Sequence, residues 1–323
     1  MLNEEILKVK DLSVNFHIED RVITAVDGVS FSLSKGETLA LVGESGCGKS
    51  VTALSIIGLL QTPPARIADG EILFRGENLL RKSPEEMREI RGKDISMIFQ
   101  EPMTSLNPVF TIGRQISEVI MRHQNLSKKE ALSKTIEMLK LVRIPLPEKV
   151  IRQYPHQLSG GMRQRVMIAI ALACGPGLLI ADEPTTALDV TVEAQILELI
   201  NELKDKLNSA IIMISHDLRV VSEIADKVAV MYSGRIVEYA DVHSVFSEPK
   251  HPYTRGLIEA VPSIDTDKRK RLKEIKGVVP LPDEIKEGCR FKTRCDCVRK
   301  DCMAKEPQFF KVGSNLVRCW NYA

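Results

Sequence analysis

The chain has 323 residues, more than the roughly 250–300 at which one hydrophobic core usually stops growing, so we expect one large domain and an appendage. Its 44% hydrophobic and 27% charged residues exclude wholesale disorder. A formal net charge of +2 is too small to argue for nucleic acid or an anionic membrane. The longest uncharged runs, such as Val166–Ala181, are shorter than the ~20 residues of a bilayer span, and the early acids after Met1 argue against an export signal.

The first 35 residues alternate apolar and polar positions, which predicts antiparallel strands with one covered face. Continuous apolar runs then predict strands buried on both faces. These runs are Thr38–Val42, Ile95–Phe99, Leu178–Ala181, Ala210–Ile214 and Val228–Met231. Helical patterns lie between them, so the sequence predicts an α/β fold whose sheet is covered by helices on both faces.

Two capping boxes mark helix starts, at Ser83–Glu86 and Ser127–Glu130. Val192, Ile196, Leu199, Ile200 and Leu203 hold the helical period. The region from about 90 to 175 is mainly helical, and we expect it to form a subdomain.

Proline and charge become frequent near Pro249, and no long period is visible beyond it. We therefore place a boundary near residue 260, with a main domain at 1–260 and a small cysteine-rich domain at 261–323. The basic run Lys268–Arg271 is interpreted as a solvated linker, because no aromatic residue that could stack a base lies beside it.

The sharpest motif is Gly43-Glu-Ser-Gly-Cys-Gly48-Lys49-Ser50, a phosphate-binding loop between a buried strand and a helix expected over Ser50–Leu60. Glycines let successive backbone N–H groups turn toward phosphates, and the helix points its positive end there. The Lys49 ammonium suits the β- and γ-phosphates, and the Ser50 hydroxyl suits Mg²⁺. Cys47, inside the loop, is expected to fill a small buried space.

A second motif places Asp182 and Glu183 at the carboxyl end of the run Leu178–Ala181, the edge where open α/β sheets bind ligands. Asp182 would hold Mg²⁺, and Glu183 would orient and deprotonate an attacking water. Between the two motifs, Leu158-Ser159-Gly160-Gly161-Met162 opens an apolar helix with a second glycine-rich anion-binding start.

Together these motifs make residues 4–260 resemble the nucleotide-binding subunit of an ABC transporter. The resemblance implies a mixed sheet with N-terminal antiparallel strands and a helical subdomain. It assigns Gln100 to a loop that senses Mg²⁺ and water, Leu158–Met162 to the signature, Ala187-Leu188-Asp189 to the D-loop and His216 to the γ-phosphate switch. Met162 stands where the family usually has Gln. The implied ATP contacts are Phe16, which would stack on adenine, with Gly43, Ser45, Gly46, Cys47, Gly48, Lys49, Ser50, Val51, Ser159, Gly160, Gly161 and Asp189.

The resemblance also implies a mechanism and partners. Two such subunits would close head to tail over two ATP molecules, each held by the phosphate loop of one and the Ser159–Gly161 region of the other. The segment Gln100–Pro108 would contact two transmembrane permease subunits at the cytoplasmic face of the membrane. The second ATPase would be a paralogue or a copy of this chain, and an extracellular binding protein would deliver the cargo.

The tail is similar to that of dipeptide and oligopeptide importer subunits, through His251-Pro-Tyr-Thr-Arg-Gly-Leu257 and the end Arg318-Cys319-Trp320. Cys289, Cys295, Cys302 and Cys319 follow the spacing of that group, which implies a [4Fe–4S] cluster, with zinc as the alternative. Cys297 is an extra thiol that could replace Cys295 as a ligand. We expect Cys174 to pack in a core.

Two other functions stay open at this stage. A soluble ABC-type ATPase acting on DNA or the ribosome usually carries two cassettes or a long coiled coil, and this chain has one phosphate loop and no heptad run. Related importers also carry nickel complexes, so the cargo is not fixed by the sequence. The expected activity is ATP hydrolysis that moves a permease.

Overall fold

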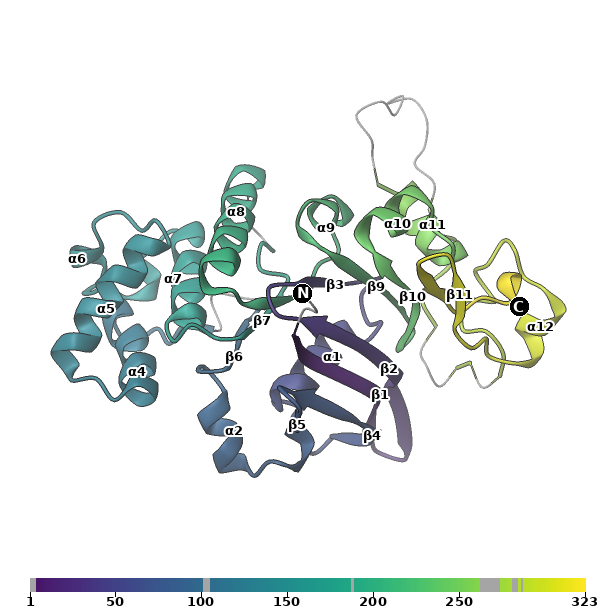
Figure 1. The fold of residues 1–323 in the computed structure, drawn as a ribbon, viewed down its shortest axis with the longest axis horizontal. Helices are drawn as coiled ribbons and strands as arrows, with labels where there is room; N and C mark the ends of the chain where they lie inside the picture. The colour runs from purple at the N-terminus through teal and green to yellow at the C-terminus, as the bar shows by residue number, and fades with distance from the viewer. Residues whose placement is uncertain (1–3, 101–104, 187–188, 262–273, 281–283, 286) are drawn as a thin grey trace. The chain divides into compact units, whose positions relative to one another are not determined.

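The computed structural model describes residues 4–323 except 101–104, 187–188, 262–273, 281–283 and 286 (Figure 1). The chain divides into two compact units. Unit 1 consists of the described parts of residues 1–6, 34–37 and 81–212, and unit 2 of those of 7–33, 38–80 and 213–323. The run Lys268–Arg271 lies outside the described residues.

Unit 1 is mainly helical. Its helices are α2 (Pro84–Ile90), α4 (Ile112–Gln124), α5 (Lys128–Leu141), α6 (Pro147–Val150), α7 (Gly160–Leu172) and α8 (Val190–Leu207). Both predicted capping boxes are present, at Ser83 and Ser127. Helices α4, α5 and α7 pack on one another, and α7 also packs on a strand, β6.

The strands of unit 1 are β6 (Ile95–Ile98) and β7 (Leu178–Asp182), which pair in parallel with Ile95 opposite Leu178 and Ile98 opposite Ala181. Strand β8 (Ala210–Ile214) begins in unit 1 and ends in unit 2. Every residue of β7 and β8 is buried, as the continuous apolar runs predicted.

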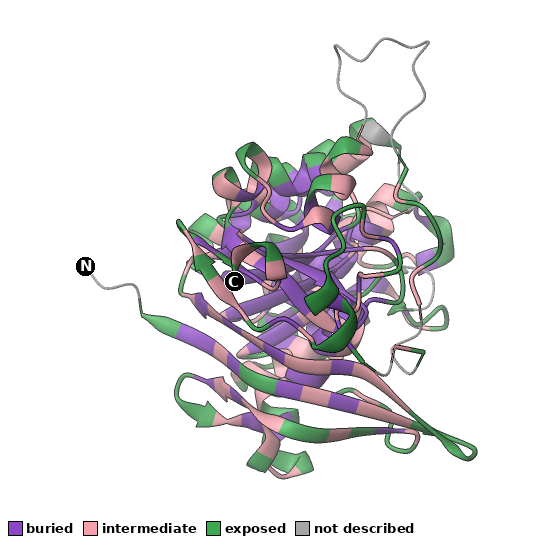
Figure 2. Cartoon of the chain, turned by 90° about the vertical axis from the view of Figure 1, so that its right-hand side faces the viewer, coloured by how far each residue is buried: buried purple, intermediate pink, exposed green. Residues whose placement is uncertain are grey.

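Unit 2 contains an antiparallel sheet of order β2-β1-β4-β5, whose strands are β1 (Glu5–Ile18), β2 (Arg21–Ser34), β4 (Ala65–Phe74) and β5 (Glu77–Asn78). Only the first two residues of β1 belong to unit 1. Figure 2 shows buried residues recurring along these long strands between more exposed ones, which is the alternation expected of a sheet with one covered face.

A second, mixed set of strands in unit 2 has the order β11-β12-β10-β9-β3. The parallel pair is β3 (Thr38–Val42) with β9 (Lys227–Tyr232). The antiparallel members are β10 (Arg235–Asp241), β11 (Phe310–Val312) and β12 (Asn315–Val317). The helices of unit 2 are α1 (Lys49–Ile57), α9 (Leu218–Ile224), α10 (Val242–Ser247), α11 (Pro252–Glu259) and α12 (Lys300–Ala304).

The tail is integrated into unit 2, which the sequence did not predict. Its hairpin β11–β12 extends the strand order through β10, and Phe291 is part of the core cluster with Val42, Tyr232 and Tyr253. Buried Glu238 on β10 accepts hydrogen bonds from the His251 N–H (2.8 Å) and from Asn315 Nδ2 (2.8 Å). These contacts join β10, the start of α11 and the tail hairpin.

Candidate functional site

The phosphate loop Gly43–Ser50 connects β3 to α1 in unit 2. At two positions of this loop only glycine fits, because the backbone of another segment lies where a Cβ atom would be. Gly43 has φ +149°, and a Cβ there would lie 2.2 Å from the Met231 carbonyl oxygen. Gly48 has φ +101°, and its Cβ would lie 2.7 Å from the Ala25 oxygen. Ser45 and Gly46 are exposed at the apex, while Ser50 and Val51 are half-buried at the start of the helix.

Lys49 lies inside this loop with only 6% of its surface exposed. Its Nζ donates hydrogen bonds to the carbonyl oxygens of Gly43 (2.7 Å) and Glu44 (3.0 Å) and contacts Cys47 Sγ at 3.6 Å. The loop therefore holds its own ammonium group at its centre. Cys47 is fully buried, as expected, and burial raises the pKa of its thiol.

Side chains from later in unit 2 surround the second loop residue, Glu44. The Glu44 N–H donates to the Tyr253 hydroxyl at 2.8 Å, and the Glu44 carboxylate pairs with Arg294 through bonds of 2.6 and 2.9 Å. Neither partner was a predicted site residue. His251 caps α11 through a hydrogen bond from the Tyr253 N–H to its Nδ1 (3.1 Å), and complete burial lowers the pKa of His251 to about 3.

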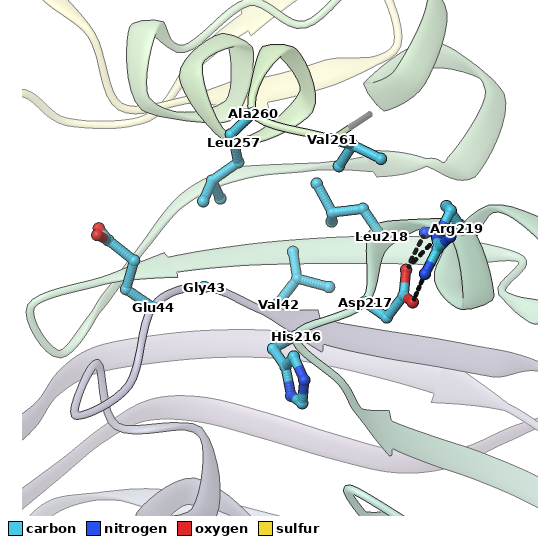
Figure 3. A pocket seen from close by; sticks show the side chains of 10 residues that line it. All are labelled: Val42, Gly43, Glu44, His216, Asp217, Leu218, Arg219, Leu257, Ala260 and Val261. Atoms are coloured by element: carbon cyan, nitrogen blue, oxygen red, sulfur yellow. Dashed lines mark hydrogen bonds and ion pairs between the residues drawn. The ribbon is translucent and has the colours of Figure 1, made fainter. Parts of the chain in front are cut away.

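His216, which follows β8, lines a cavity of about 400 Å³ together with Gly43 and Glu44 (Figure 3). Leu257 from α11 lines the same cavity. Nearby Asp217 forms an ion pair with Arg219 at 2.7 Å, and this hydrogen bond lowers the pKa of the Asp217 carboxyl. Unit 2 thus brings His216 to the beginning of the phosphate loop. Phe16 is half-buried on β1, opposite Ala65 of β4.

The acidic strand end lies in unit 1. Asp182 is the last residue of β7 and only 6% exposed, and Glu183 follows in a left-handed backbone conformation with φ +46°. Glu183 Oε2 accepts hydrogen bonds from Gln100 Nε2 (2.9 Å) and from the Thr186 hydroxyl (3.0 Å). The structure therefore brings Gln100 and Glu183 together, 83 positions apart in the chain. Thr186 was not predicted, and its only sequence signal is its place three residues after the glutamate.

The other predicted residues of unit 1 cap helices. Ser159 is the exposed N-cap of α7, and its side chain accepts the Met162 N–H at 3.3 Å. Gly160 and Gly161 form the first turn of that helix. Asp189 is the N-cap of α8 and accepts the Val192 N–H at 3.0 Å. Of the expected D-loop, residues 187–188 lie outside the described residues, as do 101–104 of the expected permease contact.

The seven cysteines are all free thiols. In the tail, Cys302 and Cys319 are buried, Cys289 and Cys295 are half-buried, and Cys297 is exposed. Burial raises the pKa of Cys289 to about 12 and that of Cys295 to about 11. Among the described residues, no three Cys, His, Asp or Glu side chains lie close enough together to hold one metal ion. The structure therefore gives no support to a preformed zinc ribbon, whose ligands share one ion.

Hydrogen bonds that involve backbone groups nevertheless order the segments that carry three of the tail cysteines. The Cys289 N–H donates to the Cys302 carbonyl at 2.8 Å. Cys295 Sγ accepts the Cys297 N–H at 3.3 Å, and Cys302 Sγ accepts the Arg299 N–H at 3.4 Å. The backbone bond between Cys289 and Cys302 therefore places two of the expected ligands on adjacent segments, although no three such side chains among the described residues could hold one metal ion.

No helix within the described ranges is long and apolar enough to cross a bilayer. A family described as "ABC transporter" matches residues 26–186. The solved ATP-binding cassette MJ0796, a dimeric post-hydrolysis state bound to ADP and Pi, is similar with 26% identity and a TM-score of 0.66. That match covers 73% of this chain and 99% of the other. Fold and phosphate loop together define an ATPase of the ATP-binding cassette class.

Full-length relatives narrow the class. A second family, described as "Oligopeptide/dipeptide transporter, C-terminal region", matches residues 237–302. The oligopeptide transport ATP-binding protein AppD of Bacillus subtilis (strain 168) is 53% identical over 318 residues, 98% of this chain and 97% of its own length. The dipeptide transport ATP-binding protein DppD of the same organism is 51% identical over 318 residues, 98% of this chain and 95% of its own length. The chain belongs to this family of oligopeptide and dipeptide transport ATP-binding proteins.

Proposed function

We propose that this chain is the ATP-hydrolysing subunit of an importer for dipeptides or oligopeptides. The observation that carries the proposal is similarity over 98% of the chain to relatives named for that transport. The match extends through the tail, at residues 237–302, and so is not limited to the ATP-binding cassette that many transporters share.

The nucleotide site in this proposal consists of the residues that the family motifs assign to it. The loop Gly43–Ser50 cradles the phosphates, Lys49 supplies the cation, and Ser50 and Asp182, as hard oxygen ligands, hold Mg²⁺ with Gln100 nearby. Phe16 stacks on adenine. Glu183 accepts the proton of the attacking water, and His216 contacts the γ-phosphate. The exposed N-terminus of α7, with Ser159, Gly160 and Gly161, is suited to bind the phosphates of ATP on a second subunit, and Asp189 lies at that interface.

The partners in this proposal are two transmembrane permease subunits and a second ATPase, either a paralogue or another copy. ATP binding closes the pair of ATPases and hydrolysis releases it, a population shift driven by the γ-phosphate. The chain would lie at the cytoplasmic face of the membrane as a peripheral subunit, and an extracellular peptide-binding protein would act upstream of the permeases. In sequence terms we propose a main domain at 1–260 and a cysteine-rich domain at 261–323, the second of which joins unit 2 through the pairing of β12 with β10.

Transport by cells tests the proposed cargo. A strain whose chain carries Glu183→Gln is expected to lose uptake of radiolabelled dipeptides or oligopeptides and to keep uptake of nickel. A strain carrying Glu193→Gln is the control, because that carboxylate binds the Thr185 hydroxyl at 2.6 Å and has no proposed catalytic role. Loss of nickel uptake alone would assign the cargo to nickel complexes. Normal uptake of both, with a defect in DNA maintenance or translation, would favour the soluble ATPase.

We also propose that Cys289, Cys295, Cys302 and Cys319 hold a [4Fe–4S] cluster. Each thiolate of such a cluster would bind a different iron, so the four cysteines need not share a single metal position, and the lack of such a position among the described residues is compatible with the proposal. The backbone N–H bonds to Cys295 and Cys302 Sγ are of the kind that stabilise metal-bound thiolates. When bound, the cluster would either cross-link distant parts of the tail or act as a redox-sensitive group.

Chemical analysis tests the cluster. Protein purified without oxygen is expected to contain about four irons and four sulfides per chain, with broad absorption near ~400 nm. Cys302→Ser should lower both contents, whereas Cys174→Ser, which removes a thiol in unit 1, should leave them unchanged. A content of one zinc and no iron would show that the tail forms a zinc ribbon and holds no cluster. Equal iron contents in Cys297→Ser and in unaltered protein would show that Cys297 is not needed, and would favour Cys295 as the fourth ligand.

A further inference from the structure

The segment Cys289–Cys295 reaches the phosphate loop through two arginines. We propose that this segment, which we term the clamp segment, positions the phosphate loop and thereby sets its affinity for ATP. The inference rests on the proposed assignment of Gly43–Ser50 as the ATP site and adds Arg294 and Arg290 to it as positioning residues. Clamp segment and loop both belong to unit 2.

Arg294 makes the most direct connection. Its side chain is only 3% exposed, and its guanidinium binds both carboxylate oxygens of Glu44, from Nη1 at 2.6 Å and from Nη2 at 2.9 Å. The guanidinium also binds backbone oxygens, because Nε donates to the Lys276 carbonyl at 2.9 Å and Nη2 donates to those of Ile275 and Gly277, both at 3.2 Å. A two-pronged, charge-assisted bond of this kind fixes direction as well as distance.

Glu44 transmits that position to the loop. Its N–H is fixed by the Tyr253 hydroxyl at 2.8 Å, its carboxylate by Arg294, and its carbonyl oxygen accepts from Lys49 Nζ at 3.0 Å. The peptide groups around Glu44 therefore determine where the Lys49 ammonium rests. Glu44 is also the loop's only acidic residue, so without Arg294 its carboxylate would oppose the phosphates of ATP.

Arg290 supports the middle of the loop. It pairs with Asp27 and donates to the Ser233 carbonyl, in the turn between β9 and β10. In the same turn the Gly234 N–H donates to the Cys47 carbonyl at 3.0 Å. One arginine of the clamp segment thus acts on the beginning of the loop and the other, through this turn, on its middle.

The clamp segment is itself anchored. Phe291, 3% exposed, packs its ring against those of Tyr232 and Tyr253, with centroid distances of 5.1 and 5.4 Å. Arg290 directly follows Cys289 and Arg294 directly precedes Cys295. Any ligand that fixes these two cysteines therefore also restricts both arginines. A loop held in its binding conformation before ATP arrives loses less conformational entropy on binding, and this raises affinity.

The test measures ATP binding to the full-length chain by equilibrium dialysis in the presence of Mg²⁺. Arg294→Gln is expected to raise the Kd for ATP about tenfold, equivalent to ~1.4 kcal/mol. Lys292→Ala is the matched control, since this cation of the same segment donates only to the Glu287 carbonyl within the tail among its described hydrogen bonds. Its Kd should equal that of unaltered protein.

A double-mutant cycle separates positioning from general destabilisation. If Arg294 acts through Glu44, then Glu44→Gln should partly restore ATP binding to Arg294→Gln, because it removes the unpaired carboxylate. Three results would each contradict the positioning role of the clamp segment. They are unchanged ATP affinity in Arg294→Gln, an equal loss of ATP affinity in Lys292→Ala, and strictly additive losses of ATP affinity in the double variant. Retained ATP binding in Lys49→Ala would instead contradict the proposed ATP site itself, so the two failures are distinguishable.

Discussion

Replacement of Glu183 by Gln is expected to lower the rate of ATP hydrolysis by at least about 100-fold, the lower range of general-base contributions, while ATP still binds. The substitution preserves the shape of the side chain but removes its capacity to take a proton from water. Two donors, Gln100 Nε2 and the Thr186 hydroxyl, converge on Glu183 Oε2, and this arrangement orients the carboxylate. The left-handed backbone at Glu183 further fixes its direction.

Phosphate release and equilibrium ATP binding are the two measurements, because binding must be retained if only the chemical step is lost. Glu193→Gln is again a suitable control, since it neutralises a half-buried carboxylate at the start of α8 in the same unit. Near-normal turnover in Glu183→Gln would refute its assignment as the general base. A matching loss of ATP binding would show that the carboxylate acts in binding and not in the chemical step.

Local sequence patterns predicted the elements that form the site. The runs Thr38–Val42 and Ala210–Ile214 are strands with those same bounds, because a strand buried on both faces has apolar side chains at every position. The helix after the phosphate loop ends at Ile57, where Gly58 takes a left-handed conformation, and not at Leu60. The N-caps at Ser83 and Ser127 depend on residues three positions apart and are therefore visible in the sequence.

The contacts that position those elements were not predictable in the same way. Glu44 and Arg294 are separated by 250 positions, and the Thr38 N–H donates to the carboxylate of Asp226, 188 positions away. No periodicity covers such distances. The tail hairpin was missed because each of its strands has three residues, too few to show an alternating pattern, and it is held mainly by pairing with β10. The sequence motifs thus identified the chemical groups of the site, whereas the long-range contacts that position those groups were found only in the three-dimensional structure.

Removal of the Lys49 side chain tests the phosphate loop as the ATP site, and Lys49→Ala is expected to weaken ATP binding at least about 100-fold, equivalent to ~2.7 kcal/mol. The ammonium is nearly buried, so its attraction for phosphate is weakened little by solvent. Its current partners are the carbonyl oxygens of Gly43 and Glu44, which attract it less strongly than a polyphosphate would. We therefore expect the Lys49 ammonium to exchange these carbonyl oxygens for the phosphates of ATP without a change in the fold of the loop.

Titration of ATP with and without Mg²⁺, on Lys49→Ala and Ser50→Ala in parallel, distinguishes the two roles at this loop. Lys49→Ala should lose affinity under both conditions, because it removes a positive charge that acts on the phosphates directly. Ser50→Ala should lose affinity only when Mg²⁺ is present, because its hydroxyl is assigned to the metal. Lys35→Ala, which removes a cation of unit 1, should bind ATP normally. Normal ATP binding by Lys49→Ala would contradict the assignment of the phosphate loop as the ATP site. Equal losses of ATP affinity in all three variants would indicate a general effect of charge or folding.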